Sequence, residues 1–151
     1  MSARYLVVDG HSVIFAWPDL RALHDHNRAY ARKVLADRLQ QLHDTTSWRV
    51  TLILDGKLGT AVASGSKKPY DMVIAYATAD QTADSIIERL VASSGVVQEI
   101  LVITADEVEK LTVESLGAAS ASPEWLLKML EQEGSSFADE LSRIHRTARW
   151  K

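Results

Sequence analysis

Short apolar runs alternate along this chain with longer segments in which apolar residues recur every three or four positions. The short runs are typical of buried strands, which we expect at Tyr5–Val8, Val50–Leu54, Met72–Tyr76 and Ile100–Thr104. The longer segments are typical of amphipathic helices, which we expect from Asn27 through Leu42, over Thr82–Val91, from Ser122 to near Gly134, and over Ser136–Arg149. Strands that alternate with helices predict an α/β three-layer sandwich around a mostly parallel sheet.

Two other stretches are expected to be irregular. A loop that carries His11 and Ser12 is expected after Asp9, with a turn at Pro18. Gly56–Lys68 is rich in Gly, Ser, Ala and Lys, which is typical of a long surface loop. No linker or internal repeat divides the sequence, so residues 1–151 are expected to form a single domain whose last helix covers about 136–149.

Composition narrows the class of protein. The 151 residues are 46% hydrophobic and 25% charged, which is ordinary for a globular domain. There is no cysteine, which excludes disulfides, thiolate nucleophiles and cysteine-based zinc sites. With a net charge of −3, any nucleic-acid site would have to be a local basic patch. No apolar run approaches the roughly 20 residues of a membrane span, and the first is too short for a signal peptide, so a cytoplasmic protein is expected.

Aspartates stand at the ends of three predicted strands and at the start of one predicted helix. Asp9, Asp55 and Asp106 follow strands, and Asp84 lies in the first turn of the helix that Thr82 begins. Parallel strands bring their carboxyl ends to one edge of the sheet, where folds of this class hold their ligands. Carboxylates that converge there repel one another and are made tolerable by a hard cation. The pattern therefore indicates a Mg²⁺ or Mn²⁺ site in a hydrolase of phosphate esters.

Each of these residues also has a simpler structural interpretation. A single aspartate after a strand commonly forms a turn or caps a helix, and Asp84 alone would stabilise the N-terminus of its helix. Four such residues in one small chain favour a metal site over four unrelated turns and caps. Glu88, on the same helix face as Asp84, is expected to join Ser12 in an auxiliary set, and Glu107 could substitute for Asp106.

Three blocks of the sequence carry a family resemblance. They are Val8-Asp9-Gly10-His11-Ser12-Val13-Ile14 with the following Ala16-Trp17-Pro18, the stretch Thr82–Val91, and Val102-Ile103-Thr104-Ala105-Asp106 followed by Gly117-Ala118 and Ser122. From about residue 4 to residue 131, their order and spacing resemble the YacP-like branch of the NYN domain family, which belongs to the PIN-like ribonuclease superfamily. This chain has His11 and Ser12 where the family usually has tyrosine and asparagine.

The resemblance implies a PIN-like three-layer fold and an RNA endonuclease that uses Mg²⁺ or Mn²⁺, in some family members in the context of the ribosome. Carried onto this sequence, it implies that Asp9, Asp55, Asp84 and Asp106 form the catalytic, metal-binding set. It also implies hydrolysis that leaves 5′-phosphate and 3′-hydroxyl ends.

Candidate RNA contacts lie at the mouth of this site and on the loop that follows Asp55. They are His11, Ser12, Lys57, Lys67 and Lys68. For the three lysines, an arm that follows the phosphate backbone competes with the simpler interpretation of a solvated loop. A non-catalytic RNA- or ribosome-binding module that retains the fold is the main alternative function. A metal-dependent phosphatase of small substrates is a third.

Overall fold

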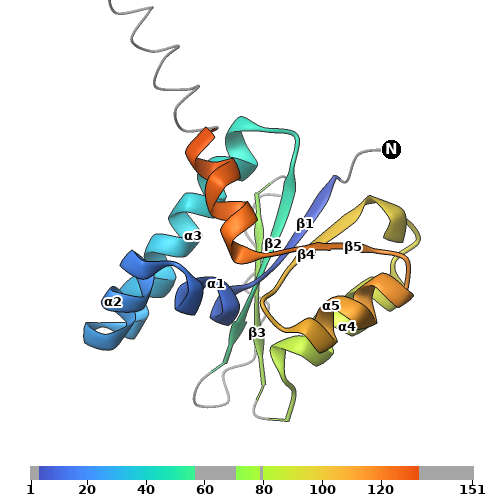
Figure 1. Ribbon diagram of the computed structural model, residues 1–151, viewed down its shortest axis with the longest axis horizontal. Coiled ribbons are helices and arrows are strands. Elements are labelled where there is room, and N and C mark those ends of the chain that lie inside the picture. The colour runs from blue at the N-terminus through green and yellow to red at the C-terminus, as the bar shows by residue number, and fades with distance from the viewer. Residues whose placement is uncertain (1–3, 57–70, 79, 133–151) are drawn as a thin grey trace, which may run out of the picture.

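The computed structural model describes residues 4–56, 71–78 and 80–132, which are built around a five-stranded sheet (Figure 1). The strands are β1 (Tyr5–Asp9), β2 (Arg49–Asp55), β3 (Val73–Ala77), β4 (Ile100–Ile103) and β5 (Ala119–Ala121). The α-helices are α1 (Gly10–Ala16), α2 (Pro18–His26), α3 (Arg28–Thr45), α4 (Ala83–Ser93) and α5 (Glu107–Ser115), followed by a helix over 123–132. A 3₁₀ turn, η2 (Val97–Glu99), precedes β4.

Helices cover both faces of the sheet and so create three layers, as Figure 1 shows. One apolar cluster joins the sheet to α1, α2, α3 and the 123–132 helix, with Trp17 and Leu126 fully buried in it. Trp17 Nε1 also donates a 2.9 Å hydrogen bond to the carbonyl of Pro123, which ties α1 and α2 to the last described helix. A second cluster joins the other face to α4 and α5 through Ile87 and Val113.

The strands lie in the order β3-β2-β1-β4-β5, so the chain builds the sheet first on one side of β1 and then on the other. The chain moves from β1 outward to β2 and β3, and then crosses with α4 to β4 on the other side of β1. Because the two crossovers carry their helices on opposite faces, the loops after β1 and β4 diverge and leave a crevice at their carboxyl ends. Asp9 ends β1, and the register pairs Val8 with Ile103, so Asp9 lies beside the residue that follows β4. A ligand site is expected at this crevice.

The α/β three-layer architecture predicted from the sequence is confirmed, and the sheet is parallel throughout the described residues. The four predicted strands are present, with ends that differ by one residue. The predicted caps also form, since Asn27 accepts from the Tyr30 N–H at 3.0 Å and Thr82 accepts from the Ser85 N–H at 3.0 Å. None of the helices in the described ranges is long and apolar enough to cross a membrane.

Two predictions for the N-terminal region are wrong. His11 and Ser12 lie in α1 rather than in a loop, because Asp9 accepts from the Ser12 N–H at 3.4 Å and begins the helix directly after β1. Pro18 is the first residue of α2, a position where its missing N–H costs no hydrogen bond, and the bend lies at the extended backbone of Trp17. The helices α2 and α5 and the short β5 were not predicted from the sequence.

Three further predictions fall on parts of the chain outside the described ranges. They are the loop beyond Gly56, the helix end near Gly134 and the helix over 136–149.

The start of α1 packs tightly against β2. A Cβ atom at Gly10 would lie 2.5 Å from Leu54 Cδ2 and 3.0 Å from the carbonyl oxygen of Ile53. No side chain fits in this space, so glycine permits the close approach of α1 to the sheet and fixes where Asp9 and the residues after it can lie.

Gly10→Ala is therefore expected to lower the free energy of unfolding by about 1–3 kcal/mol, because the added methyl group must displace Leu54 and the backbone of β2. Gly95→Ala is the matched control, since an added Cβ there has no heavy atom within 4 Å. Urea unfolding followed by circular dichroism measures both variants. Wild-type stability of Gly10→Ala would mean that α1 can shift away from β2 at little cost.

Candidate active site

Asp9 is held in place by three hydrogen-bond donors. Its side chain is buried, and its Oδ2 accepts from Ser12 Oγ at 2.8 Å and from Thr104 Oγ1 at 3.2 Å. The Ser12 backbone N–H donates to Oδ1 at 3.4 Å. A carboxylate that leaves water needs such donors, and these fix its orientation at the carboxyl end of β1.

The two hydroxyls that hold Asp9 also connect α1 to the loop after β4. The Ala105 N–H donates to Ser12 Oγ at 3.1 Å, and the Asp106 N–H donates to Thr104 Oγ1 at 3.2 Å. Ser12 thus lies beside Asp9, as expected for the auxiliary set. From the sequence, Thr104 was expected only as the end of a strand, although a hydroxyl residue after an aliphatic run was a usable signal.

Asp106 begins α5. Its Oδ1 accepts from the Val108 N–H at 2.9 Å and from the Glu109 N–H at 3.3 Å, which makes it the N-cap of the helix. The simpler structural interpretation of this residue as a cap is therefore correct. The same two bonds also hold its carboxylate at the crevice.

A third carboxylate comes from α4, where Asp84 lies in the first turn. Burial raises the pKa of Asp84 to about 6, and the negative charges of Asp9 and Asp106 add to the effect. Asp84 therefore lies within electrostatic reach of the other two carboxylates, which come from two other parts of the chain.

Asp9, Asp84 and Asp106 line one open cleft with a volume of about 470 Å³. The other residues that line it are His11, Ser12, Phe15, Ala16 and Ala105. The cleft has the size of a typical small-ligand site and lies at the crevice between the ends of β1 and β4. This is the position at which the topology predicts a ligand.

Asp55 does not line this cleft. The register pairs Asp9 with Ile53, so Asp55 lies two residues, or about 7 Å, farther along its strand. Its side chain is half exposed, its Oδ2 is 3.9 Å from His11 Nδ1, and both residues line a separate small pocket. The structure thus brings together three of the four predicted carboxylates and separates the fourth.

A buried glutamate of α5 lies next to these carboxylates. Glu109 is 2% exposed, and its Oε1 has no hydrogen-bond partner among the described residues. Burial, followed by the contact with Glu88 and the charges of Asp84 and Asp106, raises the pKa of Glu109 to about 8. Glu109 is therefore neutral at pH 7. Glu109 was not among the residues predicted from the sequence, although its four-residue spacing from Val113 places it on the inner face of α5.

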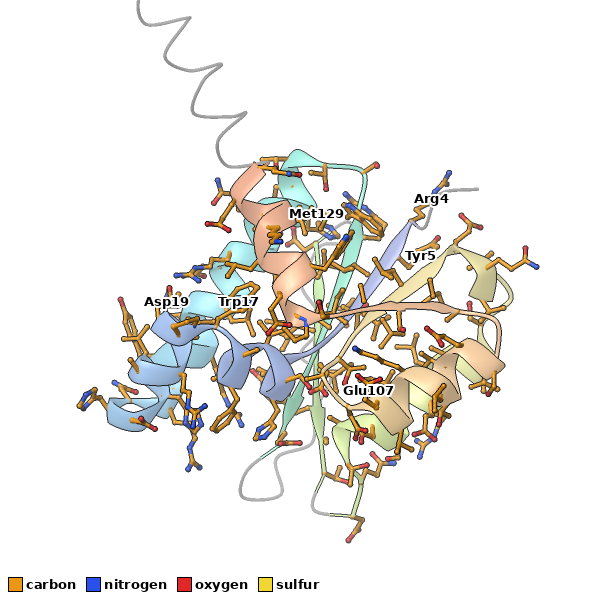
Figure 2. The ribbon with its side chains drawn as sticks, viewed as in Figure 1. Arg4, Tyr5, Trp17, Asp19, Glu107 and Met129 are labelled. Carbon is orange, nitrogen blue, oxygen red and sulfur yellow. The ribbon has the colours of Figure 1, made fainter. Side chains whose placement is uncertain are left out.

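Glu107 does not substitute for Asp106. Its side chain is 82% exposed and lies 3.4 Å from Lys110 Nζ, one turn along α5. Figure 2 shows Glu107 at the start of this helix. The predicted phosphate contacts Lys57, Lys67 and Lys68 lie outside the described ranges.

The chemistry of the donors fits a hard divalent cation. Asp9 is buried, Asp84 is half-buried and Asp106 is exposed, and the repulsion that Asp9 and Asp106 exert on Asp84 would be relieved by a positive charge. Across the ranges that the structure describes, no set of three Asp, Glu or His side chains already has the arrangement of metal ligands. Mg²⁺ is compatible with this, because it keeps several waters and commonly takes only one or two carboxylates.

Comparisons with known proteins identify the family of this chain. The family model of the YacP-like NYN domain matches residues 6–151. The chain belongs to this family. NYN domains form a PIN-like nuclease family, and the protein is accordingly a member of a ribonuclease family.

Two kinds of relative support the assignment to the YacP-like NYN family. YacP from Bacillus subtilis is 29% identical over 127 residues, which are 83% of this chain and 74% of YacP. The crystal structure of Rae1 (YacP) from Bacillus subtilis has a TM-score of 0.77 at 27% identity, over 95% of this chain and 82% of that chain. A mutant of Rae1 gives a TM-score of 0.78 at 26% identity, over 93% and 82%. The predicted family and its three-layer fold are confirmed.

The buried carboxyl of Glu109 makes the stability of this NYN domain depend on pH. The folded protein keeps the Glu109 proton up to about pH 8, whereas the ordinary pKa is 4.5. Because the folded state binds more protons over this window, its free energy of unfolding should decrease as the pH rises from about 5 to 8. Glu109→Gln removes the titration. From pH 5 to pH 8, we therefore expect the free energy of unfolding of Glu109→Gln to rise by on the order of 2 kcal/mol relative to that of the wild type.

Urea unfolding in EDTA at pH 5 and pH 8 measures this difference. Glu107→Gln, on the exposed side of the same helix, is the matched control and should follow the wild type. Parallel pH dependence in wild type and Glu109→Gln would mean that Glu109 is ionised in the folded protein throughout.

Proposed function

We propose that this protein is a Mg²⁺- or Mn²⁺-dependent endoribonuclease that cleaves phosphodiester bonds in RNA. The observation that carries the proposal is the convergence of Asp9, Asp84 and Asp106 in one open cleft at the reversal of the strand order. Membership of a PIN-like nuclease family supports RNA as the substrate class. Ribosome-associated mRNA, implied by the sequence resemblance, is a finer proposal that rests on the resemblance alone.

The proposal gives each carboxylate of the cleft a role. Asp9, fixed by the hydroxyls of Ser12 and Thr104, would be the most buried ligand of the cation. Asp84 in the first turn of α4 and Asp106 at the N-cap of α5 would complete the set, at helix N-termini where the helix dipole favours negative charge. When bound, the cation would activate a water and stabilise charge on the departing oxygen.

Asp55 would act differently from the other three. Since it lies beside His11 and outside the cleft, we assign it to the orientation of the imidazole rather than to the cation. His11 would then contact the RNA, while Ser12 acts by positioning Asp9.

A non-catalytic RNA-binding module is the second candidate function. The absence of an arranged set of three ligands in the described part of the chain favours it. The capping of α5 by Asp106 also favours it, because the two N–H groups at the start of that helix occupy Oδ1, one of the carboxylate oxygens of the cleft. In this case the cleft would hold RNA without cutting it.

Asp84→Asn is expected to abolish cation binding and to reduce RNA cleavage by at least about 100-fold, because a neutral amide neither attracts nor holds the cation. Calorimetric titration with MnCl₂ and cleavage of a labelled single-stranded RNA measure the two effects. Asp37→Asn is the matched control, since it changes an exposed aspartate of α3 that pairs with Lys33.

Two outcomes would contradict this assignment. An Asp84→Asn protein that cuts RNA at the wild-type rate would remove Asp84 from the site. Wild-type protein that binds RNA equally with and without Mg²⁺, yet never cuts it, would favour the non-catalytic module.

A further inference from the structure

Three rings lie in a row beside the carboxylate cleft. His11 and Phe15, four residues apart on α1, have ring centroids 4.5 Å apart and an interplanar angle of 41°. Phe15 and His24 of α2 have centroids 4.8 Å apart and an interplanar angle of 59°. We call these three side chains the ring row. Because tilted ring pairs at these distances attract one another, the ring row has a defined geometry without a ligand.

The ring row is continuous with the cleft at one end. His11 and Phe15 line the cleft together with Asp9 and Asp84, whereas His24 lines only the neighbouring small pocket. The side chain of His11 is 62% exposed, so the ring at the cleft end is open to solvent. A planar group that leaves the cleft in this direction meets His11 first.

Two arginines accompany the ring row. Arg21 Cζ lies 5.9 Å from the centroid of Phe15, within the range of a cation–π contact. Arg32 of α3 lines the small pocket. Neither arginine forms an ion pair with the described residues. The carboxylate in this pocket, Asp55, lies 3.9 Å from His11. The positive charges of Arg21 and Arg32 therefore lie next to the rings and are not paired with a described carboxylate.

We propose that the ring row binds unpaired RNA next to the cleaved bond, with a base stacked on His11 and neighbouring phosphates held by Arg21 and Arg32. The proposal rests on the proposed function and adds the class of RNA. In a duplex the faces of the bases are covered by their neighbours, so only an unstacked base can lie on a protein ring. Guanidinium groups bind phosphate oxygens in a planar, bidentate manner. Rings and arginines together therefore select a flexible single strand.

Binding of labelled RNA tests the ring row. Fluorescence anisotropy would compare an unpaired RNA of about 12 nucleotides with a duplex of equal length, with and without Mg²⁺, and gels would verify that the RNA stays intact. His11→Ala is expected to weaken binding of the unpaired RNA by about 10-fold or more and to leave the duplex unaffected. His11→Tyr, which keeps a ring, should retain binding.

Substitution of the arginines tests the phosphate contacts. Arg21→Gln and Arg32→Gln are each expected to weaken binding and to lower the slope of log K against log salt by about 0.7 to 1. Lys33→Gln is the matched control, because it removes a positive charge from the position next to Arg32 that is already paired with Asp37. It should bind RNA as the wild type does.

The outcomes separate this proposal from the nuclease proposal. If His11→Ala and Arg32→Gln both bind unpaired RNA with wild-type affinity, the proposal that the ring row binds RNA is overturned. It is also overturned if the wild-type protein does not bind unpaired RNA at low salt. If the variants lose binding but the wild type never cuts RNA with Mg²⁺, the ring row stands and the nuclease proposal fails. If His11→Ala cuts single-stranded RNA with unchanged KM and Asp84→Asn does not cut, the nuclease stands and the ring row fails.

Discussion

The mutual repulsion of Asp9, Asp84 and Asp106 is the constraint on which the rest of this site depends. Burial and, after it, the negative charges of Asp9 and Asp106 raise the pKa of Asp84, so this side chain takes up a proton more readily than an ordinary aspartate. The fold opposes this in two ways. The hydroxyls of Ser12 and Thr104 hold Asp9, and the helix N-termini of α4 and α5 stabilise the other two. The carboxylates therefore remain together without a cation, at a cost that a cation would relieve.

The sheet decides which carboxylates share this constraint. Because β1 is central and the chain reverses direction around it, the ends of β1 and β4 border the same crevice, while the end of β2 lies beyond it. The residue of β2 that is level with Asp9 is Ile53, which is not a carboxylate. The two-residue offset of Asp55 thus places it beside His11 rather than in the cleft.

The sequence predicted the parts of the structure that depend on local pattern. Apolar runs and helical spacing identified four strands and the long helices, and the rule that strand ends converge identified Asp9 and Asp106 as neighbours. The exclusion of Asp55 could not be predicted, because it follows from the strand register, which depends on pairing between distant segments. The neutral form of Glu109 likewise depends on how α5 packs against α4. Seven residues of α1, polar at the start and apolar afterwards, have too little periodicity to indicate a helix.

That missed helix explains how two adjacent residues serve different parts of the site. Successive side chains on an α-helix point about 100° apart, so neighbours cannot face the same partner. Ser12 therefore faces Asp9 and the loop after β4, while His11 faces Asp55 and stacks on Phe15 one turn later. In an irregular loop, the directions of the Ser12 and His11 side chains would not be set in this way. Since Gly10 allows α1 to begin directly against β2, one short helix carries both Ser12, which holds the buried carboxylate, and His11 and Phe15 of the ring row.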